Sequence, residues 1–113
     1  MDFDEFEELL NSEIKKPQPH EVIYSVSDFI ATSNDIFEKS FPSVLIEGEI
    51  SSFKVNQNKF VFFDLKDEDS VLGCFMTVWQ LRFPLEDGMK VVAQVKPKLT
   101  NWGKFSLTVE KIT

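Results

Sequence analysis

The spacing of apolar residues changes once along the chain, from a helical period to a strict alternation. Between Val26 and Ser40 the large apolar residues form one stripe at helical spacing, which predicts a helix with Ser25 as its N-cap and Pro42 beyond its end. From Val44 onward, apolar and polar residues alternate in short runs separated by turn-forming sequences. These runs predict five β-strands, at residues 44–52, 59–66, 71–77, 89–99 and 104–112.

The five predicted strands favour a small closed or partly open barrel. Each strand has one apolar face, and a flat five-stranded sheet would leave two exposed edges. Gly48 fits a bend at a barrel corner, and the preceding helix is expected to cap one mouth. We therefore predict a mainly β fold, a five-stranded OB-fold barrel preceded by an N-terminal helix. The alternation assigns to the core Val61, Phe63, Leu65, Leu72, Cys74, Met76, Val91, Ala93, Val95, Phe105, Leu107 and Val109.

The first twenty residues differ from the rest in composition. Residues 2–14 carry apolar side chains near helical spacing on an acidic background, which predicts another helix, and the KKPQPH that follows predicts an extended linker. We expect two regions: an acidic N-terminal extension and linker at 1–20, and one OB-fold domain at 21–113.

The charge distribution does not exclude binding to a polyanion, and the composition does not suggest a membrane protein. The net charge of −7 resides in residues 1–43, whereas residues 44–113 carry nine charges of each sign. Local field, more than net charge, decides what a protein face attracts. No apolar run approaches the ~20 residues that span a bilayer, and the acidic start is unlike a signal peptide. The single cysteine, Cys74, cannot form an internal disulfide, which agrees with a reducing compartment. The sequence therefore predicts a cytoplasmic protein with no membrane partner.

Phenylalanines also occupy the outward face of the second and third predicted strands. In KFVFFDLKD, residues 59–67, alternation places Phe60 and Phe62 away from the core, and Phe75 is placed likewise on the next strand. Three lysines lie on these strands or the adjoining loop: Lys54, Lys59 and Lys66. Binding of single strands needs rings that stack on bases and cations along the backbone. From the pattern alone, these rings either bind nucleic acid or pack under the N-terminal segment or another domain.

Further candidates lie on the fourth strand and in two loops. The outward face of the fourth strand is mostly basic, and we expect Lys96 and Lys98 to contact phosphates, with Lys90 part of an ordinary solvated face. Trp102, between turn residues in TNWG, is a stacking candidate. Arg82 is a further expected phosphate contact.

The sequence contains no recognisable catalytic constellation. It has no Ser-His-Asp or Cys-His arrangement and no glycine-rich phosphate loop. Glu47 and Glu49 are expected on a solvated face, Asp67 in a turn, and Cys74 buried and inert. We expect no catalytic residue, no metal ligand and no cofactor in this chain.

Five motifs follow one another in order and spacing: YSVSDF (24–29), VLIEGEISSFK (44–54), FFDLKDEDS (62–70), LRFPLEDGMKV (81–91) and GKFSL (103–107). Together they resemble the N-terminal domain of the exodeoxyribonuclease VII large subunit. The resemblance implies an OB-fold that binds single-stranded DNA, a nuclease active site in a later domain that this chain lacks, and a small partner subunit. We accordingly expect the first domain of a longer DNA hydrolase, cut at a domain boundary.

The predicted function is single-stranded DNA binding in an exodeoxyribonuclease VII-like large subunit, guiding strands to the missing catalytic domain. Its expected partners are single-stranded DNA, the remainder of the large subunit and the small subunit. The rings would stack bases and the basic residues follow phosphates, with little sequence preference. The main alternative is an OB-type adaptor that binds a protein partner or neighbouring subunit through its aromatic face. A tRNA-reading OB module is a third possibility.

Overall fold

The computed structural model describes residues 2–5 and 22–113. Residues 3–5 are helical, and the rest of the helix and linker expected in the first twenty residues lie outside the described residues. The elements in chain order are α2 (Val26–Ser40), β1 (Val44–Asn56), β2 (Phe60–Lys66), β3 (Val71–Thr77), the single 3₁₀ turn η1 (Val78–Gln80), β4 (Lys90–Leu99) and β5 (Phe105–Ile112). Within the described residues, no helix has the length and apolar character needed to cross a membrane.

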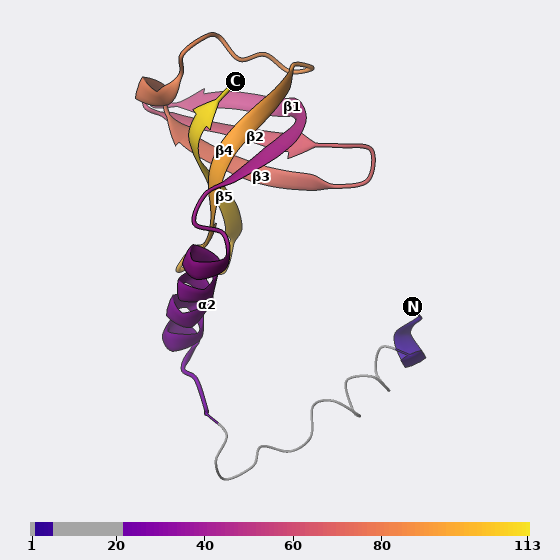
Figure 1. The fold of residues 1–113 in the computed structure, drawn as a ribbon, viewed down its shortest axis with the longest axis vertical. Helices are drawn as coiled ribbons and strands as arrows, with labels where there is room; N and C mark the ends of the chain where they lie inside the picture. The colour runs from indigo at the N-terminus through magenta and orange to yellow at the C-terminus, as the bar shows by residue number, and fades with distance from the viewer. Residues whose placement is uncertain (1, 6–21) are drawn as a thin grey trace.

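The strands close into a barrel in the order β1-β2-β3-β5-β4, which confirms the predicted fold class (Figure 1). β1 pairs antiparallel with β2 along one part of its length and with β4 along another. Closure comes from a parallel pairing of β3 with β5, in which Cys74 lies opposite Leu107. Each strand therefore has a paired neighbour on both sides, although β3 and β5 pair over a short stretch, at Cys74–Leu107 and Phe75–Thr108.

Alternating side chains from the strands fill the barrel interior. The predicted inward residues of β2 and β4 are confirmed, with Val61 and Val95 fully buried and Phe63 at 2% exposure. The connection from β3 to β4 adds to this core, because it buries Leu85 there and packs Phe83 against it. The side chains with period-two spacing therefore form one continuous apolar core.

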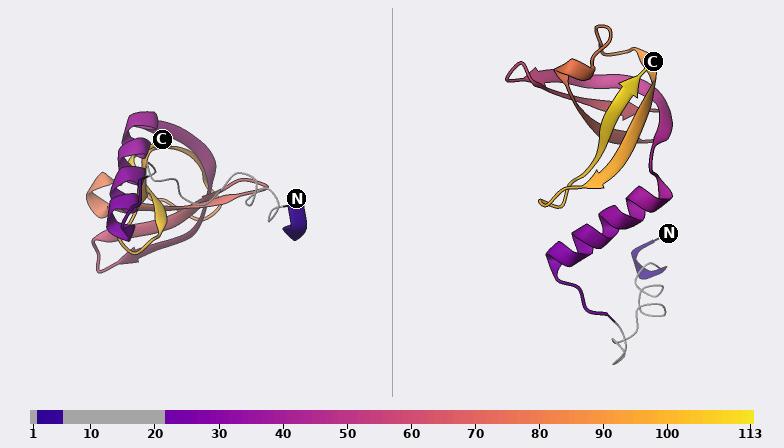
Figure 2. Two further views of the ribbon diagram at one scale, coloured as in Figure 1. Left: turned by 90° about the horizontal axis from the view of Figure 1, so that it is seen from below. Right: turned by 60° about the vertical axis from the view of Figure 1, so that its left-hand side comes forward.

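Phe105 is a correction to the predicted core. Its side chain is 45% exposed, and its ring lies edge-on to Phe37 of α2, with centroids 5.7 Å apart. Phe105 is the first residue of β5, where the β4–β5 hairpin extends toward α2 (Figure 2). Alternation gives the side of a strand that a residue faces, but it does not say where the strand leaves the barrel.

β1 is longer than predicted because a bulge interrupts its alternation. The strand continues past Ser52, whose φ is 52°, and its pairing with β2 shifts between Ser51 and Lys54. Such a bulge bends the strand, and this one divides the part of β1 that pairs with β2, with Glu49–Ser51 before it and Lys54–Asn56 after it. Nearby, a Cβ on Gly48 would lie 3.0 Å from Leu65 Cδ2, so glycine permits close approach of β1 and β2.

The helix α2 begins where predicted and flanks the β4–β5 hairpin. The backbone N–H of Asp28 donates to Ser25 Oγ at 3.0 Å, which is the expected N-cap. Asn34 holds the helix to β4: its Nδ2 donates to the carbonyl of Leu99, and its Oδ1 accepts from the N–H of the same residue. No α2 residue belongs to the barrel core, so among the described elements the helix flanks the barrel instead of sealing a mouth as expected.

Candidate nucleic-acid interface

Three phenylalanine rings form a cluster on the outer face of β2 and β3. Phe62 and Phe75 occupy directly opposed positions with ring centroids 5.3 Å apart, and Phe60 lies 5.8 Å from Phe75. The strand alternation that buries Val61 and Phe63 forces the intervening rings outward. All three rings are half-buried, so each keeps surface available to a ligand.

Two of the predicted lysines lie beside these rings. Lys54 Nζ is 5.9 Å from the centroid of Phe62, and Lys59 Nζ is 5.2 Å from that of Phe60. These distances fall within the range of cation–π contacts, which hold the ammonium groups near the ring faces. The cluster therefore combines stacking surface with positive charge, the two requirements of a single-strand site.

An open groove of about 750 Å³ runs from the ring pair toward the β4–β5 hairpin. It brings together four residues predicted from the sequence: Lys54, Phe62, Phe75 and Lys98. Phe60 and Lys59 adjoin the groove through the ring cluster without lining it.

The groove also contains residues that the sequence prediction missed. Phe105 at the start of β5 and Lys104 just before it line the groove, as do Asp64 on β2 and Gly73 on β3. The GKFSL motif contains Lys104 and Phe105, but nothing local shows that β5 lies next to β3. Asp64 follows Phe62 at the period of a strand, so alternation places it on the same face, but it was not among the predicted binding residues.

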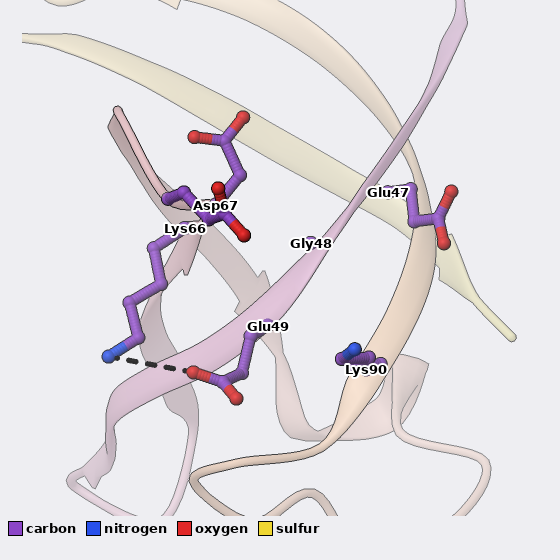
Figure 3. A pocket seen from close by; sticks show the side chains of 7 residues that line it. Glu47, Gly48, Glu49, Lys66, Asp67 and Lys90 are labelled. Atoms are coloured by element: carbon purple, nitrogen blue, oxygen red, sulfur yellow. Dashed lines mark ion pairs between the residues drawn. The ribbon is translucent and has the colours of Figure 1, made fainter.

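Lys66 lies away from the ring cluster, in a concavity of about 650 Å³ lined mostly by carboxylates (Figure 3). Its ammonium pairs with Glu49 across 3.6 Å, and Glu47, Asp67 and Glu68 line the same concavity. An exposed pair of this kind contributes little stability, but it places a negative charge beside the lysine. The structure thus separates Lys66 from the other predicted phosphate contacts. Among the described residues no group of three or more His, Cys, Asp or Glu side chains is placed to hold a metal ion.

Asp67 has the structural role expected of a turn residue. Its carboxylate accepts hydrogen bonds from the backbone N–H groups of Asp69 and Ser70, both at 2.9 Å. These hydrogen bonds favour the charged form and lower the pKa of Asp67. The side chain is thereby committed to the β2–β3 turn.

The remaining predicted residues lie outside the groove. Lys96 lines a recess of about 260 Å³ between α2 and β4, which shares Lys98 with the groove. Trp102 is 89% exposed at the tip of the β4–β5 hairpin, and Arg82 is exposed in the connection to β4. Neither Trp102 nor Arg82 lines the groove. Their roles in binding remain predictions.

Cys74 lies beneath the groove and is expected to be unreactive in the folded protein. Its side chain is 3% exposed, and burial, with a smaller contribution from the Asp64 carboxylate, raises the pKa of its thiol to about 12. Because the thiolate is the reactive form, the folded protein should react slowly with Ellman's reagent, without marked acceleration between about pH 7 and 9. Unfolding in denaturant should make the reaction fast. Rapid stoichiometric labelling of the native protein would contradict this prediction.

Comparison with protein families identifies a match across most of the chain. The family model described as an OB-fold nucleic acid binding domain matches residues 24–113. The relatives include three proteins named exodeoxyribonuclease 7 large subunit. The protein of Rickettsia canadensis is 32% identical over 97 residues, which cover 79% of this chain and 21% of the relative. The protein of Rickettsia typhi is 29% identical over 112 residues (92% of this chain, 23% of the relative), and that of Nitrosomonas europaea is 32% identical over 100 residues (85% of this chain, 22% of the relative). The matches confirm the resemblance seen in the motifs. This chain spans 21–23% of the length of these relatives.

Solved structures agree on the fold. Asparaginyl-tRNA synthetase from Pyrococcus horikoshii, complexed with asparaginyl-adenylate, matches with a TM-score of 0.52 and 15% identity, over 63% of this chain and 18% of that one. A replication protein A heterotrimer bound to single-stranded DNA matches with a TM-score of 0.52 and 10% identity, over 62% of this chain and 54% of that one. At such identities the likeness shows the fold alone.

Proposed function

The chain belongs to the family of OB-fold nucleic acid binding domains, and from this premise we propose that its ring cluster and the adjoining groove bind single-stranded DNA. The observation that carries the proposal is the packing of Phe60, Phe62 and Phe75 into one half-buried surface cluster, with Lys54 and Lys59 over two of its rings. Bases stack on rings whatever their identity, and each stacked base is worth ~1–3 kcal/mol.

In this proposal the strand follows the groove from the ring cluster to the β4–β5 hairpin. Phe62 and Phe75 stack on neighbouring bases, and Phe60 extends the stacking surface beyond the groove. Lys54 and Lys59 hold phosphates at the ring end, and Lys98 and Lys104 hold them at the hairpin end. The lysines lie along the path, so the backbone can track the groove while the bases face the rings.

The relatives suggest the larger protein in which such a domain acts. We propose that this chain is the single-stranded DNA-binding domain of an exodeoxyribonuclease VII-like large subunit, guiding strands to a catalytic domain outside this chain. The rest of the large subunit and a small subunit are the proposed protein partners. Catalysis is assigned to that other domain, and we propose no cofactor for this one.

A protein contact is supported by a different surface, the outer side of α2. Val26, Phe29 and Ile36 are 80%, 57% and 57% exposed, which leaves apolar area open on the helix even though the Phe29 ring lies edge-on to Tyr24. This surface lies on α2, apart from the residues that line the groove. A domain or subunit contact through α2 would therefore leave the ring cluster open to DNA.

The dependence of binding on salt separates DNA from a protein ligand at the ring cluster. If four lysines each neutralise a phosphate, the logarithm of the association constant should fall with the logarithm of salt concentration with a slope of about −3. Fluorescence anisotropy with a labelled oligothymidylate at several salt concentrations measures this slope. Replacing Lys98 and Lys104 together with alanine should bring the slope to about −1.4, since two phosphate contacts are lost.

Lys66→Ala provides a matched control, because this lysine is paired with Glu49 outside the groove. It should leave the slope close to that of the wild type. Absence of oligonucleotide binding at low salt, or an affinity that does not change with salt, would refute the proposed function.

A further inference from the structure

Among the described residues that line the groove, one carries a carboxylate: Asp64 on β2. Asp64 lies directly opposite Gly73 on β3, and a Cβ built on Gly73 would be 3.9 Å from Asp64 Oδ1. The carboxylate therefore extends over a position with no side chain, and the space above Gly73 stays open. A ligand group entering this space meets the carboxylate oxygens.

The position of Asp64 relative to the rings decides which part of a DNA strand it faces. Phe62 and Phe75 form the next pair on the same face of the β2–β3 ladder. Residues two apart on a strand are separated by about 7 Å. A base stacked on either ring extends several ångströms from the ring centre, so its edge reaches the space beside Asp64. With a base stacked on the ring pair, the carboxylate would therefore face the edge of that base and not its ring face.

The carboxylate has its hydrogen-bonding capacity available for a ligand. In the described part of the chain the ion pair within 4 Å is that of Lys66 with Glu49, and the carboxylates that accept hydrogen bonds there are those of other residues, not that of Asp64. An ionised carboxylate accepts hydrogen bonds and donates none. It would repel a phosphate in the same place. These properties suit a group that selects bases carrying N–H donors.

We propose that Asp64 gives the groove a preference for bases with amino groups on the Watson–Crick edge, with guanine preferred most; this inference rests on the proposed function. Bases in a single strand have that edge free for protein contacts. Guanine presents N1–H and the N2 amino group side by side, which matches the two oxygens of a carboxylate. Cytosine and adenine present one amino group each. Thymine presents one N–H between two carbonyl oxygens, which repel the carboxylate.

The test compares short oligothymidylates that carry one central guanine, cytosine, adenine or hypoxanthine, by fluorescence anisotropy at fixed salt. With wild-type protein, guanine should bind about tenfold more tightly than thymine at that position. Hypoxanthine, which lacks the N2 amino group, should lose part of that gain. Asp64→Ala should reduce the guanine-to-thymine ratio to the smaller value that stacking alone produces.

Two further variants make the result specific to the carboxylate. Asp64→Asn keeps the size of the side chain and should also lower the ratio, which guards against a packing defect in the alanine variant. Glu68→Ala removes the same charge from a residue outside the groove and should leave the ratio unchanged.

The possible results separate this inference from the function on which it rests. If the wild type binds no oligonucleotide, the proposed function fails, and the inference fails with it. If the wild type binds but shows the same guanine-to-thymine ratio as Asp64→Ala, the inference alone is overturned. The same conclusion follows if Asp64→Ala strengthens binding to every base by one common factor, since Asp64 would then act through charge repulsion alone.

Discussion

Replacing Phe62 with alanine is expected to weaken binding of single-stranded DNA roughly 5- to 150-fold, the equivalent of one stacked base at ~1–3 kcal/mol. Phe62 lies where the ring cluster meets the groove, 5.3 Å from Phe75 and beneath the ammonium of Lys54. Its removal deletes a stacking surface and takes away the ring that holds Lys54 in place. Its effect should therefore equal or exceed that of removing any single lysine.

The measurement is a titration of labelled oligothymidylate followed by anisotropy, with the wild type and Phe62→Ala at matched salt. The slope of affinity against salt should change little, because the variant retains every lysine. Phe29→Ala is the matched control: it removes an aromatic ring that is 57% exposed on α2, outside the groove. Equal affinities of Phe62→Ala and wild type would place the DNA elsewhere on the protein.

Replacing Leu107 with alanine is expected to cost about 2–5 kcal/mol of unfolding free energy. Leu107 is 1% exposed in the barrel core and lies opposite Cys74, where β5 closes the barrel against β3. The variant loses buried apolar surface and leaves a cavity at the closing pair. Because domains of this size are stable by only about 5–15 kcal/mol, the loss is a large fraction of the total.

Urea or thermal unfolding followed by circular dichroism measures this cost, and the midpoint temperature should fall by about 4–8 °C for each kcal/mol lost. Leu45→Ala is the matched control, because the same side chain is 70% exposed on β1. Its effect should stay within about 0.5 kcal/mol. A similar loss of stability in both variants would contradict the assignment of Leu107 to the closing core pair.

Local spacing alone was sufficient to predict the strands and the outward rings. A period of two assigned Val61 and Phe63 to the core, so the alternate positions Phe60 and Phe62 had to face out, as the structure confirms. The N-cap at Ser25 was predictable for a similar reason, since it depends on residues three apart in the chain. Structural features that depend on residues close together in the chain can therefore be predicted without a structure.

For Lys66 and Phe105, local spacing did not predict the surroundings of the side chain. Lys66 shares an alternation face with Phe62, but the pairing of β2 with β1 places it beside Glu49. Phe105 has the phase of a core residue, but the hairpin carries it out of the barrel to Phe37. In both cases a contact from a distant part of the chain decides the environment.

The sequence itself carried the five-stranded OB-fold, the ring cluster and the family resemblance, because each depends on local periodicity or on short motifs. The groove depended on the tertiary structure, since the parallel pairing of β3 with β5 brings Lys104 and Phe105 toward Phe75. The space beside Asp64 likewise follows from the register that sets it opposite Gly73. Register between strands is a property of the closed barrel, in which one shift would turn every side chain to the other face.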